Sequence, residues 1–281
     1  MVRAPSELCG HHQGCPIFLP ADLAEVSVKA AVTLSRAGFD AVVTDLDGVV
    51  TDTASLHEMA WKRLFDGFLA TCPPREGEDH RPFGNEDYRR FVDGRARFDG
   101  AAGFLASRGI GLPVEEVQAL AAEKDLDFQD LLRQHGARLL PGAVALLTAL
   151  RRSGFRVAVV TASRNCEAVL DRAGITDLFD ARVDGVTAAE LGLTGKPDPA
   201  VYLEAAGRLR TSPARSVVFE DALAGVEAGR RGGFGLVVGV SRAGHEEELI
   251  QHGADVVVPD LASIDVAPPT LPGTSKERSG S

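Results

Sequence analysis

The chain has 281 residues, of which 44% are hydrophobic and 25% are charged, and its formal net charge is −10. This composition is typical of a soluble globular protein with one large or two small domains. The negative charge argues against nucleic-acid binding, which requires a basic surface, and no apolar run is long enough to span a membrane. Because the N-terminus lacks the charged-then-apolar layout of a signal peptide, we expect a cytoplasmic protein.

The N-terminal part of the chain carries weak signals. Residues 1–20 contain Gly and Pro without periodicity, and we expect a disordered leader. The four cysteines are scattered and fit reduced thiols, and the Cys and His residues between positions 9 and 15 match no familiar zinc spacing. The loose apolar spacing over Ala21–Arg36 predicts a helix, with Gly38 as its stop.

The stretch Ala41–Thr53 carries the strongest local signal. Its first three residues are small or β-branched, which predicts a buried strand, and Asp45 and Asp47 follow at the carboxyl end. Side chains two apart on an extended backbone point the same way, and Gly48 then permits a sharp turn. Two crowded carboxylates repel unless a cation or a proton lies between them. The pattern therefore predicts a magnesium site with a carboxylate nucleophile beside an acid/base, rather than an Asp-rich surface turn.

The next part of the chain reads as entirely helical. No alternating strand pattern occurs between Ser55 and Arg138, and a polar loop spans residues 71–85. We interpret this part as a helical insertion after the first strand, forming a separate cap domain. The predicted helices are Leu56–Ala70, Glu86–Arg108 and Val114–Gln134.

From Pro141 onward, helices and strands alternate, which predicts a parallel sheet covered by helices on both faces. We thus expect an α/β protein: a three-layer Rossmann-like core with an inserted all-helical cap domain. Ligands of such sheets bind beyond the carboxyl ends of the strands. The predicted domains are a core at 21–55 and 138–266, a cap at 56–137, and a disordered leader and tail at 1–20 and 267–281. The predicted later strands are 156–161, 181–183, 216–219, 235–240 and 255–258, and the predicted later helices are 143–153, 165–173, 199–210, 222–231 and 246–252.

Two later stretches supply groups that suit a phosphate. In Val159–Asn165, the hydroxyl of Thr161 follows a strand and precedes a helix, which is the layout of a phosphate cradle, although Ser163 there fits a helix cap as well. Lys196 lies just before another predicted helix and can neutralise a phosphate together with the nucleophilic carboxylate. A surface lysine would be the default interpretation of a lone lysine, but the order Gly-Lys-Pro-x-Pro at residues 195–199 is much less expected by chance.

A third stretch, Val217–Gly225, supplies two adjacent acids. Glu220 and Asp221 end a predicted strand, where neighbouring carboxylates are unfavourable without a cation. Their hard oxygen atoms suit magnesium, which prefers a few carboxylates together with phosphate and water.

These stretches, in this order, resemble the motifs of phosphotransferases in the haloacid dehalogenase superfamily, beginning with Asp-x-Asp-Gly-x-x-x-Asp at residues 45–52. Within it, the residues from Asp52 to Trp61 and from Val92 to Gly100 resemble the cap entrance and the substrate-specificity loop of the β-phosphoglucomutase family. Asp125 departs from that family's Lys-Asn pair, which leaves the role of the side-chain amide open. Ala222 replaces a serine that is common after the metal-binding acids.

The resemblance implies a sugar-phosphate mutase that interconverts β-D-glucose 1-phosphate and glucose 6-phosphate through an aspartyl-phosphate enzyme and a 1,6-bisphosphate. It implies Asp45 as the nucleophile and Asp47 as the acid/base, with Thr161 and Lys196 completing a charge clamp. The implied cofactor is Mg²⁺. Its implied ligands are Asp45, the carbonyl of Asp47, Glu220 and Asp221.

The resemblance also implies a second phosphate site in the cap, where Arg97 would bind the phosphate that is not transferred. Without the resemblance, His57, Arg97 and Lys124 read as solvated charges, and Trp61 reads as core packing. The implied substrate-binding residues are Thr53, His57, Trp61, Gly94, Arg97, Lys124, Ala162, Ser163, Arg164 and Asn165.

Two alternative functions follow from the same residues. A magnesium-dependent phosphatase acting on a sugar phosphate or a small metabolite would use the same aspartyl phosphate, and the loop around Arg97 is what favours the mutase. A catalytically dead binding protein would be expected to lack Asp45 or Asp47, and both are present. We expect a monomer whose partner is a small phosphorylated sugar, with no nucleic-acid or membrane partner.

Overall fold

The structure of the protein, a computed structural model, describes residues 32–241 and 244–268. The predicted leader at 1–20 and the part of the predicted tail from residue 269 lie outside these residues. Six parallel strands form the main sheet in the order β4-β3-β2-β5-β6-β7. The strands are β2 (Ala41–Asp45), β3 (Arg156–Val160), β4 (Ala181–Val183), β5 (Ser216–Glu220), β6 (Leu236–Val240) and β7 (Val256–Val258).

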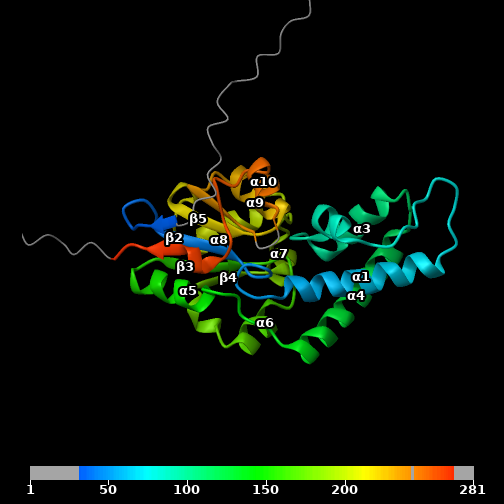
Figure 1. Cartoon of the computed structure of the whole chain (residues 1–281), viewed down its shortest axis with the longest axis horizontal. Helices are drawn as coiled ribbons and strands as arrows, with labels where there is room; N and C mark the ends of the chain where they lie inside the picture. The colour runs from blue at the N-terminus through cyan, green and yellow to red at the C-terminus, as the bar shows by residue number, and fades with distance from the viewer. Residues whose placement is uncertain (1–31, 242–243, 269–281) are drawn as a thin grey trace, which may run out of the picture.

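The central strands of the main sheet are buried on both faces, and most of their residues are apolar. Every residue of β2 and β5 is buried, and alternate side chains point to opposite faces, so Val42 and Val43 belong to different hydrophobic clusters. One face packs against α5 and α6, and the other packs against α8, α9 and α10 (Figure 1). The predicted three-layer core is confirmed. The helices around the sheet are α5 (Ala143–Arg152), α6 (Cys166–Ala173), α7 (Gly185–Leu191), α8 (Ala200–Arg208), α9 (Leu223–Arg231) and α10 (Glu246–Gln251).

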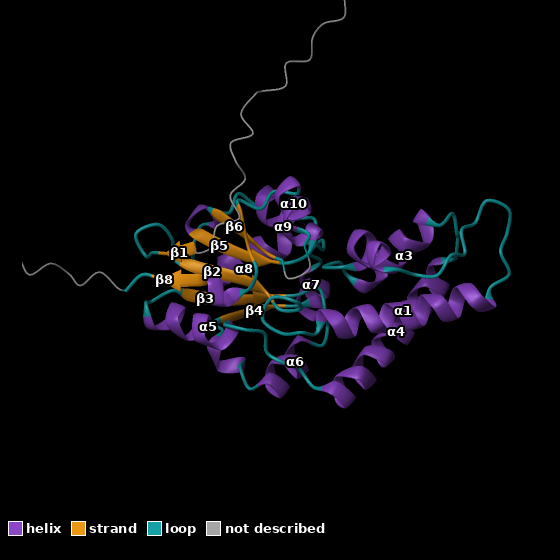
Figure 2. Cartoon of the chain, in the orientation of Figure 1, coloured by secondary structure: helices purple, strands orange, loops and turns teal. Residues whose placement is uncertain are grey.

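The predicted helix Ala21–Arg36 is wrong where the structure describes it. Val32–Leu34 forms strand β1, which pairs in parallel with β8 (Ile264–Val266), as Figure 2 shows at one end of the main sheet. Val32 and Leu34 are buried while Thr33 between them is exposed, which is the period of a strand. The partner strand lies near the other end of the chain, and it was not predicted either.

The inserted cap is helical, as predicted, and it lies to one side of the sheet (Figure 1). Its long helices α1 (Ala54–Thr71) and α4 (Val114–His135) pack against each other, and the shorter elements lie between them in sequence. The single helix predicted over Glu86–Arg108 is wrong. The chain forms α2 (Asn85–Asp87) and a π-helical turn, η1 (Tyr88–Val92), breaks at residues 93–96, and resumes as α3 (Arg97–Ser107).

The break contains Gly94, whose φ of +67° interrupts the helical backbone. A side chain at this position would also contact Ala222 of the core, since an added Cβ would lie 2.9 Å from the Cβ of Ala222. Gly94 therefore lets the cap loop approach the core closely. The exact limits of the cap, predicted as residues 56–137, stay a prediction.

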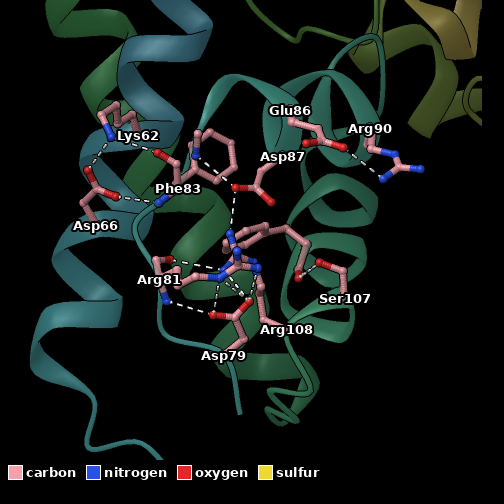
Figure 3. Close-up of polar contacts among 12 residues, drawn as sticks. Lys62, Asp66, Asp79, Arg81, Phe83, Glu86, Asp87, Arg90, Ser107 and Arg108 are labelled. Atoms are coloured by element: carbon pink, nitrogen blue, oxygen red, sulfur yellow. Dashed lines mark hydrogen bonds and ion pairs between the residues drawn. The ribbon is translucent and has the colours of Figure 1, made fainter.

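A buried arginine holds together the part of the cap between the loop after α1 and the end of α3. Arg108 forms ion pairs with Asp79 at 2.8 Å and Asp87 at 2.7 Å (Figure 3). Its guanidinium also lies over the ring of Phe104. These contacts tie the long loop after α1 to the end of α3, so that the cap forms one packed unit with its own apolar cluster.

Among the described helices, none combines the length and apolar composition that a membrane span requires.

Candidate active site

A buried lysine joins two carboxylates at the carboxyl edge of the main sheet. Lys196 Nζ lies 2.5 Å from Asp45 Oδ1, at the end of β2, and 2.7 Å from Glu220 Oε2, at the end of β5. The side chains of all three are at most 6% exposed. Because neighbouring parallel strands end at the same edge, residues far apart in sequence meet here.

The charges of this trio depend on one another. Burial and the neighbouring carboxylate of Glu220 raise the pKa of Asp45, whereas the ammonium of Lys196 opposes that rise. Burial alone would lower the pKa of Lys196, but Asp45 and Glu220 outweigh it and raise the pKa above its ordinary value. Lys196 therefore stays charged and serves as the internal counterion of both acids.

Glu220 is held by contacts on both of its carboxylate oxygens. Oε2 accepts hydrogen bonds from Lys196 and from the hydroxyl of Tyr202, and Oε1 accepts the backbone amides of Asp221 and Ala222 at 3.1 and 3.0 Å. The glycine at position 225 makes this possible, because an added Cβ would lie 1.7 Å from Oε2. This glycine thus provides room for the carboxylate, beyond the helix–sheet packing that a small residue permits.

Asp221 completes a cluster of three carboxylates that can hold a metal ion. Oxygen atoms of Asp45, Glu220 and Asp221 all lie within 4.8 Å of one another. Gly48, with a φ of +94°, leaves space for the Asp221 side chain, since a Cβ there would lie 1.8 Å from its Oδ2. When all three carboxylates are ionised, the single ammonium of Lys196 leaves a double negative charge, and the charge of Glu220 contributes to the raised pKa of Asp45. The residues therefore fit a divalent ion with hard oxygen ligands, such as Mg²⁺, and among the described residues no His or Cys belongs to the cluster.

Asp47 lies beside this cluster in a separate hydrogen-bond network. Thr53 donates to its Oδ1 at 2.5 Å, Thr161 donates to its Oδ2 at 2.6 Å, and His57 Nε2 lies 3.5 Å from Oδ1. Burial alone would raise the pKa of Asp47, but His57 and the two hydroxyls hold it well below its usual range. Asp47 is therefore an ionised carboxylate in this arrangement. Thr161, predicted to line a phosphate cradle, contacts this acid here and also accepts the backbone amide of Ser163.

The cap contributes basic groups to the other side of the site. Lys124 Nζ lies 2.5 Å from His57 Nδ1, and the His57 ring stacks on Phe128 at 3.8 Å. Burial and the positive charge of Arg97 lower the pKa of Lys124 to about 7. Trp61 belongs to the apolar cluster of the cap and also lies under the Lys124 ammonium, so it both packs and lines the site.

A small cavity of about 50 Å³ lies between core and cap. It is lined by all of the predicted site residues except Thr53, which lies behind Asp47, and Lys196, which lies behind Asp45. The sequence thus predicted residues that the fold brings together from both sides. A cavity of this size holds about one or two water molecules and is far below the roughly 300–1,000 Å³ of a ligand pocket. Two larger cavities, of about 300 and 360 Å³, adjoin it and share Asp221 and Arg97 with its lining.

Some lining and supporting residues were not predicted. Tyr88, Asp93 and Arg95 of the cap also line the cavity, and burial together with Glu220 raises the pKa of Asp93 to about 7. Tyr202 bonds Glu220 from the apolar face of α8, where its spacing indicates only core packing. Asp125, which departs from the family pattern, forms an ion pair with Arg97 and accepts a hydrogen bond from Asn165.

The comparisons with known proteins agree with this geometry. A family model described as haloacid dehalogenase-like hydrolase matches residues 39–233. The β-phosphoglucomutase of Mycobacterium tuberculosis is 45% identical over 237 residues, which cover 80% of this chain and 90% of that protein. The β-phosphoglucomutase of Bacillus subtilis is 35% identical over 221 residues, covering 78% of this chain and 88% of that one. The crystal structure of a β-phosphoglucomutase from Clostridium difficile matches with a TM-score of 0.65 and 27% identity, covering 79% of this chain and 92% of that chain.

We expect Gly225→Ala to lower the free energy of unfolding by about 1–3 kcal/mol, because the added methyl group would push Glu220 away from Lys196. Gly207→Ala is a matched control, since that helical glycine has no neighbouring atom within 4 Å of an added Cβ. The control should keep the wild-type stability or gain about 0.4–1 kcal/mol. Urea unfolding followed by circular dichroism measures both variants, and equal stabilities would contradict the proposed contact between position 225 and Glu220.

Proposed function

Because this chain belongs to the haloacid dehalogenase-like hydrolase family and is similar to β-phosphoglucomutases, we propose that it interconverts β-D-glucose 1-phosphate and glucose 6-phosphate. The observation that supports the proposal is the presence of two sets of charged residues that face one cavity, one set for phosphoryl transfer and one for phosphate binding. Asp45 and Asp47 lie on its core side, and Arg97 and Lys124 lie on its cap side. A mutase must handle two phosphates on one sugar, one for transfer and one for anchoring.

In the proposed reaction, Asp45 carries a phosphoryl group as an aspartyl phosphate. The 6-hydroxyl of β-glucose 1-phosphate attacks phosphorus, the bond to Asp45 breaks, and Asp47 accepts the hydroxyl proton. The resulting 1,6-bisphosphate reorients, and Asp45 attacks the phosphorus at position 1. Asp47 then returns the proton to the leaving sugar oxygen, which yields glucose 6-phosphate and restores the phosphoenzyme.

The charged residues around Asp45 support this chemistry. Lys196 contacts Asp45 directly, so its ammonium can neutralise the nucleophile and the phosphoryl group that the nucleophile receives. We propose that Mg²⁺ is held by Asp45, the Asp47 carbonyl, Glu220 and Asp221; when bound, it supplies neutralisation of the phosphoryl oxygens. Thr53 and Thr161 hold the carboxylate of Asp47 in place for its proton transfers.

The cap supplies what separates a mutase from a phosphatase. Both reactions use the same aspartyl phosphate, and they differ in whether a sugar hydroxyl or water accepts the phosphoryl group. The cavity of about 50 Å³ leaves little space for water, and we propose that the cap moves to admit a sugar and then closes over it. Arg97 would then bind the second phosphate as a charge-assisted partner. We propose a cytoplasmic, monomeric enzyme that acts on a small phosphorylated sugar.

Removal of divalent ions tests the metal requirement. We expect EDTA to stop turnover and added Mg²⁺ to restore it, because a divalent ion would balance the repulsion among the three clustered carboxylates. The measurement is the rate of glucose 6-phosphate formation, together with elemental analysis of the purified protein. Full activity in the chelator, or zinc in equal amount to the protein, would exclude the proposed Mg²⁺ site.

A product assay tests the mutase against the phosphatase. The enzyme with β-glucose 1-phosphate, Mg²⁺ and a trace of 1,6-bisphosphate should form glucose 6-phosphate faster than it releases free phosphate. Arg97→Ala should lose about 1.5–3 kcal/mol of transition-state binding, roughly tenfold or more in kcat/KM, because the second phosphate loses a charged partner.

The matched control is Arg90→Ala, which removes an exposed cap arginine paired with Glu86 and should leave the rate unchanged. Transfer of phosphate to Asp45 from a small phosphoryl donor should suffer much less in Arg97→Ala than isomerisation does. Free phosphate as the main wild-type product, or normal isomerisation by Arg97→Ala, would favour the phosphatase.

A further inference from the structure

The carboxylate of Asp125 connects the cap to the core. Asp125 lies on α4, and its Oδ2 is 2.7 Å from Nη1 of Arg97, which lies at the start of α3. The side-chain amide of Gln129 donates a hydrogen bond to the same oxygen at 3.2 Å. Its Oδ1 accepts a hydrogen bond from Asn165 Nδ2 of the core at 2.8 Å. One side chain therefore joins two cap helices to the loop that follows β3.

The contacts hold Asp125 as an anion. Burial alone would raise the pKa of Asp125, but the hydrogen bonds from Asn165 and Arg97 and the charge of Lys124 outweigh it, so its pKa lies below the ordinary value. The side chains of Asp125 and Arg97 are 22% and 24% exposed, so the pair is mostly shielded from solvent. An internal negative charge thus already occupies the arginine that would bind a substrate phosphate.

The same contact lies where cap and core meet around the cavity of about 50 Å³, which Asp125 and Asn165 both line. A cap movement that opens this cavity for a hexose phosphate would separate the two residues and break their link. A phosphate that then approaches Arg97 meets a carboxylate of the same charge sign. The phosphate can pair fully with the guanidinium of Arg97 only if the ion pair between Asp125 and Arg97 breaks.

We propose that Asp125 is a specificity-determining residue: an internal counterion that holds the cap on the core in the empty enzyme and releases Arg97 to the second phosphate of the substrate. The proposal rests on the proposed function for the identity of that phosphate. Ligands with an anionic group that reaches Arg97 replace the lost ion pair. Water and unphosphorylated sugars carry no anionic group and cannot replace the ion pair. The exchange of the Asp125 carboxylate for an anionic group of the ligand therefore favours ligands that carry a phosphate of their own when they bind the phosphoenzyme.

The test compares Asp125→Asn with wild type and with Asp127→Asn. The asparagine keeps the shape of the side chain and removes its charge. Asp127, on the same helix, pairs with the exposed Arg63 at 3.4 Å, so its variant removes an equal charge away from the site. Hydrogen exchange of the backbone amides at 161–165 is measured without substrate, and KM and kcat are measured with β-glucose 1-phosphate.

We expect Asp125→Asn to exchange these amides about tenfold faster and to lower KM about tenfold with little change in kcat, the effect of one charge-assisted contact. Asn165→Ala, which removes the core end of the link, should also exchange faster, and Asp127→Asn should match wild type. Unchanged exchange, or a KM that stays the same or rises in Asp125→Asn, would overturn the proposal and make Asp125 a residue that only positions Arg97. Since the exchange measurement uses no substrate, a wild-type enzyme that proved to be a phosphatase would refute the proposed function without deciding this link.

Discussion

The structure depends on one buried cation placed between two buried acids. Asp45 and Glu220 end neighbouring strands of an apolar sheet, and each would cost several kcal/mol to bury unpaired. Lys196 pairs with both, so the two strand ends can meet without repulsion. The same ammonium sets what the site can do. It holds the nucleophilic carboxylate in place and leaves the three-carboxylate cluster with a charge that suits a divalent ion.

The core and the cap divide the work of the site. The core fixes the reacting carboxylates on strand ends, where the sheet allows little movement. The cap supplies Arg97, Lys124 and His57 from helices that pack among themselves. Its helices α1 and α4 also join the hydrophobic cluster of the core, through residues such as Leu56 and Phe128. Local contacts near the site add to this interface. Gly94 against Ala222 and Asp125 against Asn165 are two of them. Substitutions in the cap can therefore change which substrate is accepted while the phosphoryl chemistry of the core stays the same.

The sequence predicted core residues that the fold brings together, because the signals for them are local. An apolar strand followed by an acid or a hydroxyl marks a strand end, and parallel topology brings such ends together. Strand β1 was missed because its partner β8 lies more than 200 residues away, and the π-helical turn before Gly94 was missed because its residues favour a continuous helix. The bond from Tyr202 to Glu220 and the link from Asp125 to Asn165 depend on tertiary packing, which no local pattern carries.

The central claim is that Asp45, poised by Lys196, carries the phosphoryl group during turnover. The most direct measurement is to quench the enzyme after incubation with the sugar 1,6-bisphosphate and Mg²⁺, and to reduce it with borohydride. Borohydride converts an acyl phosphate to an alcohol, so peptide mass spectrometry locates the modified residue. The account predicts homoserine at position 45. Modification at another residue, or no modification in an enzyme that turns over, would contradict it.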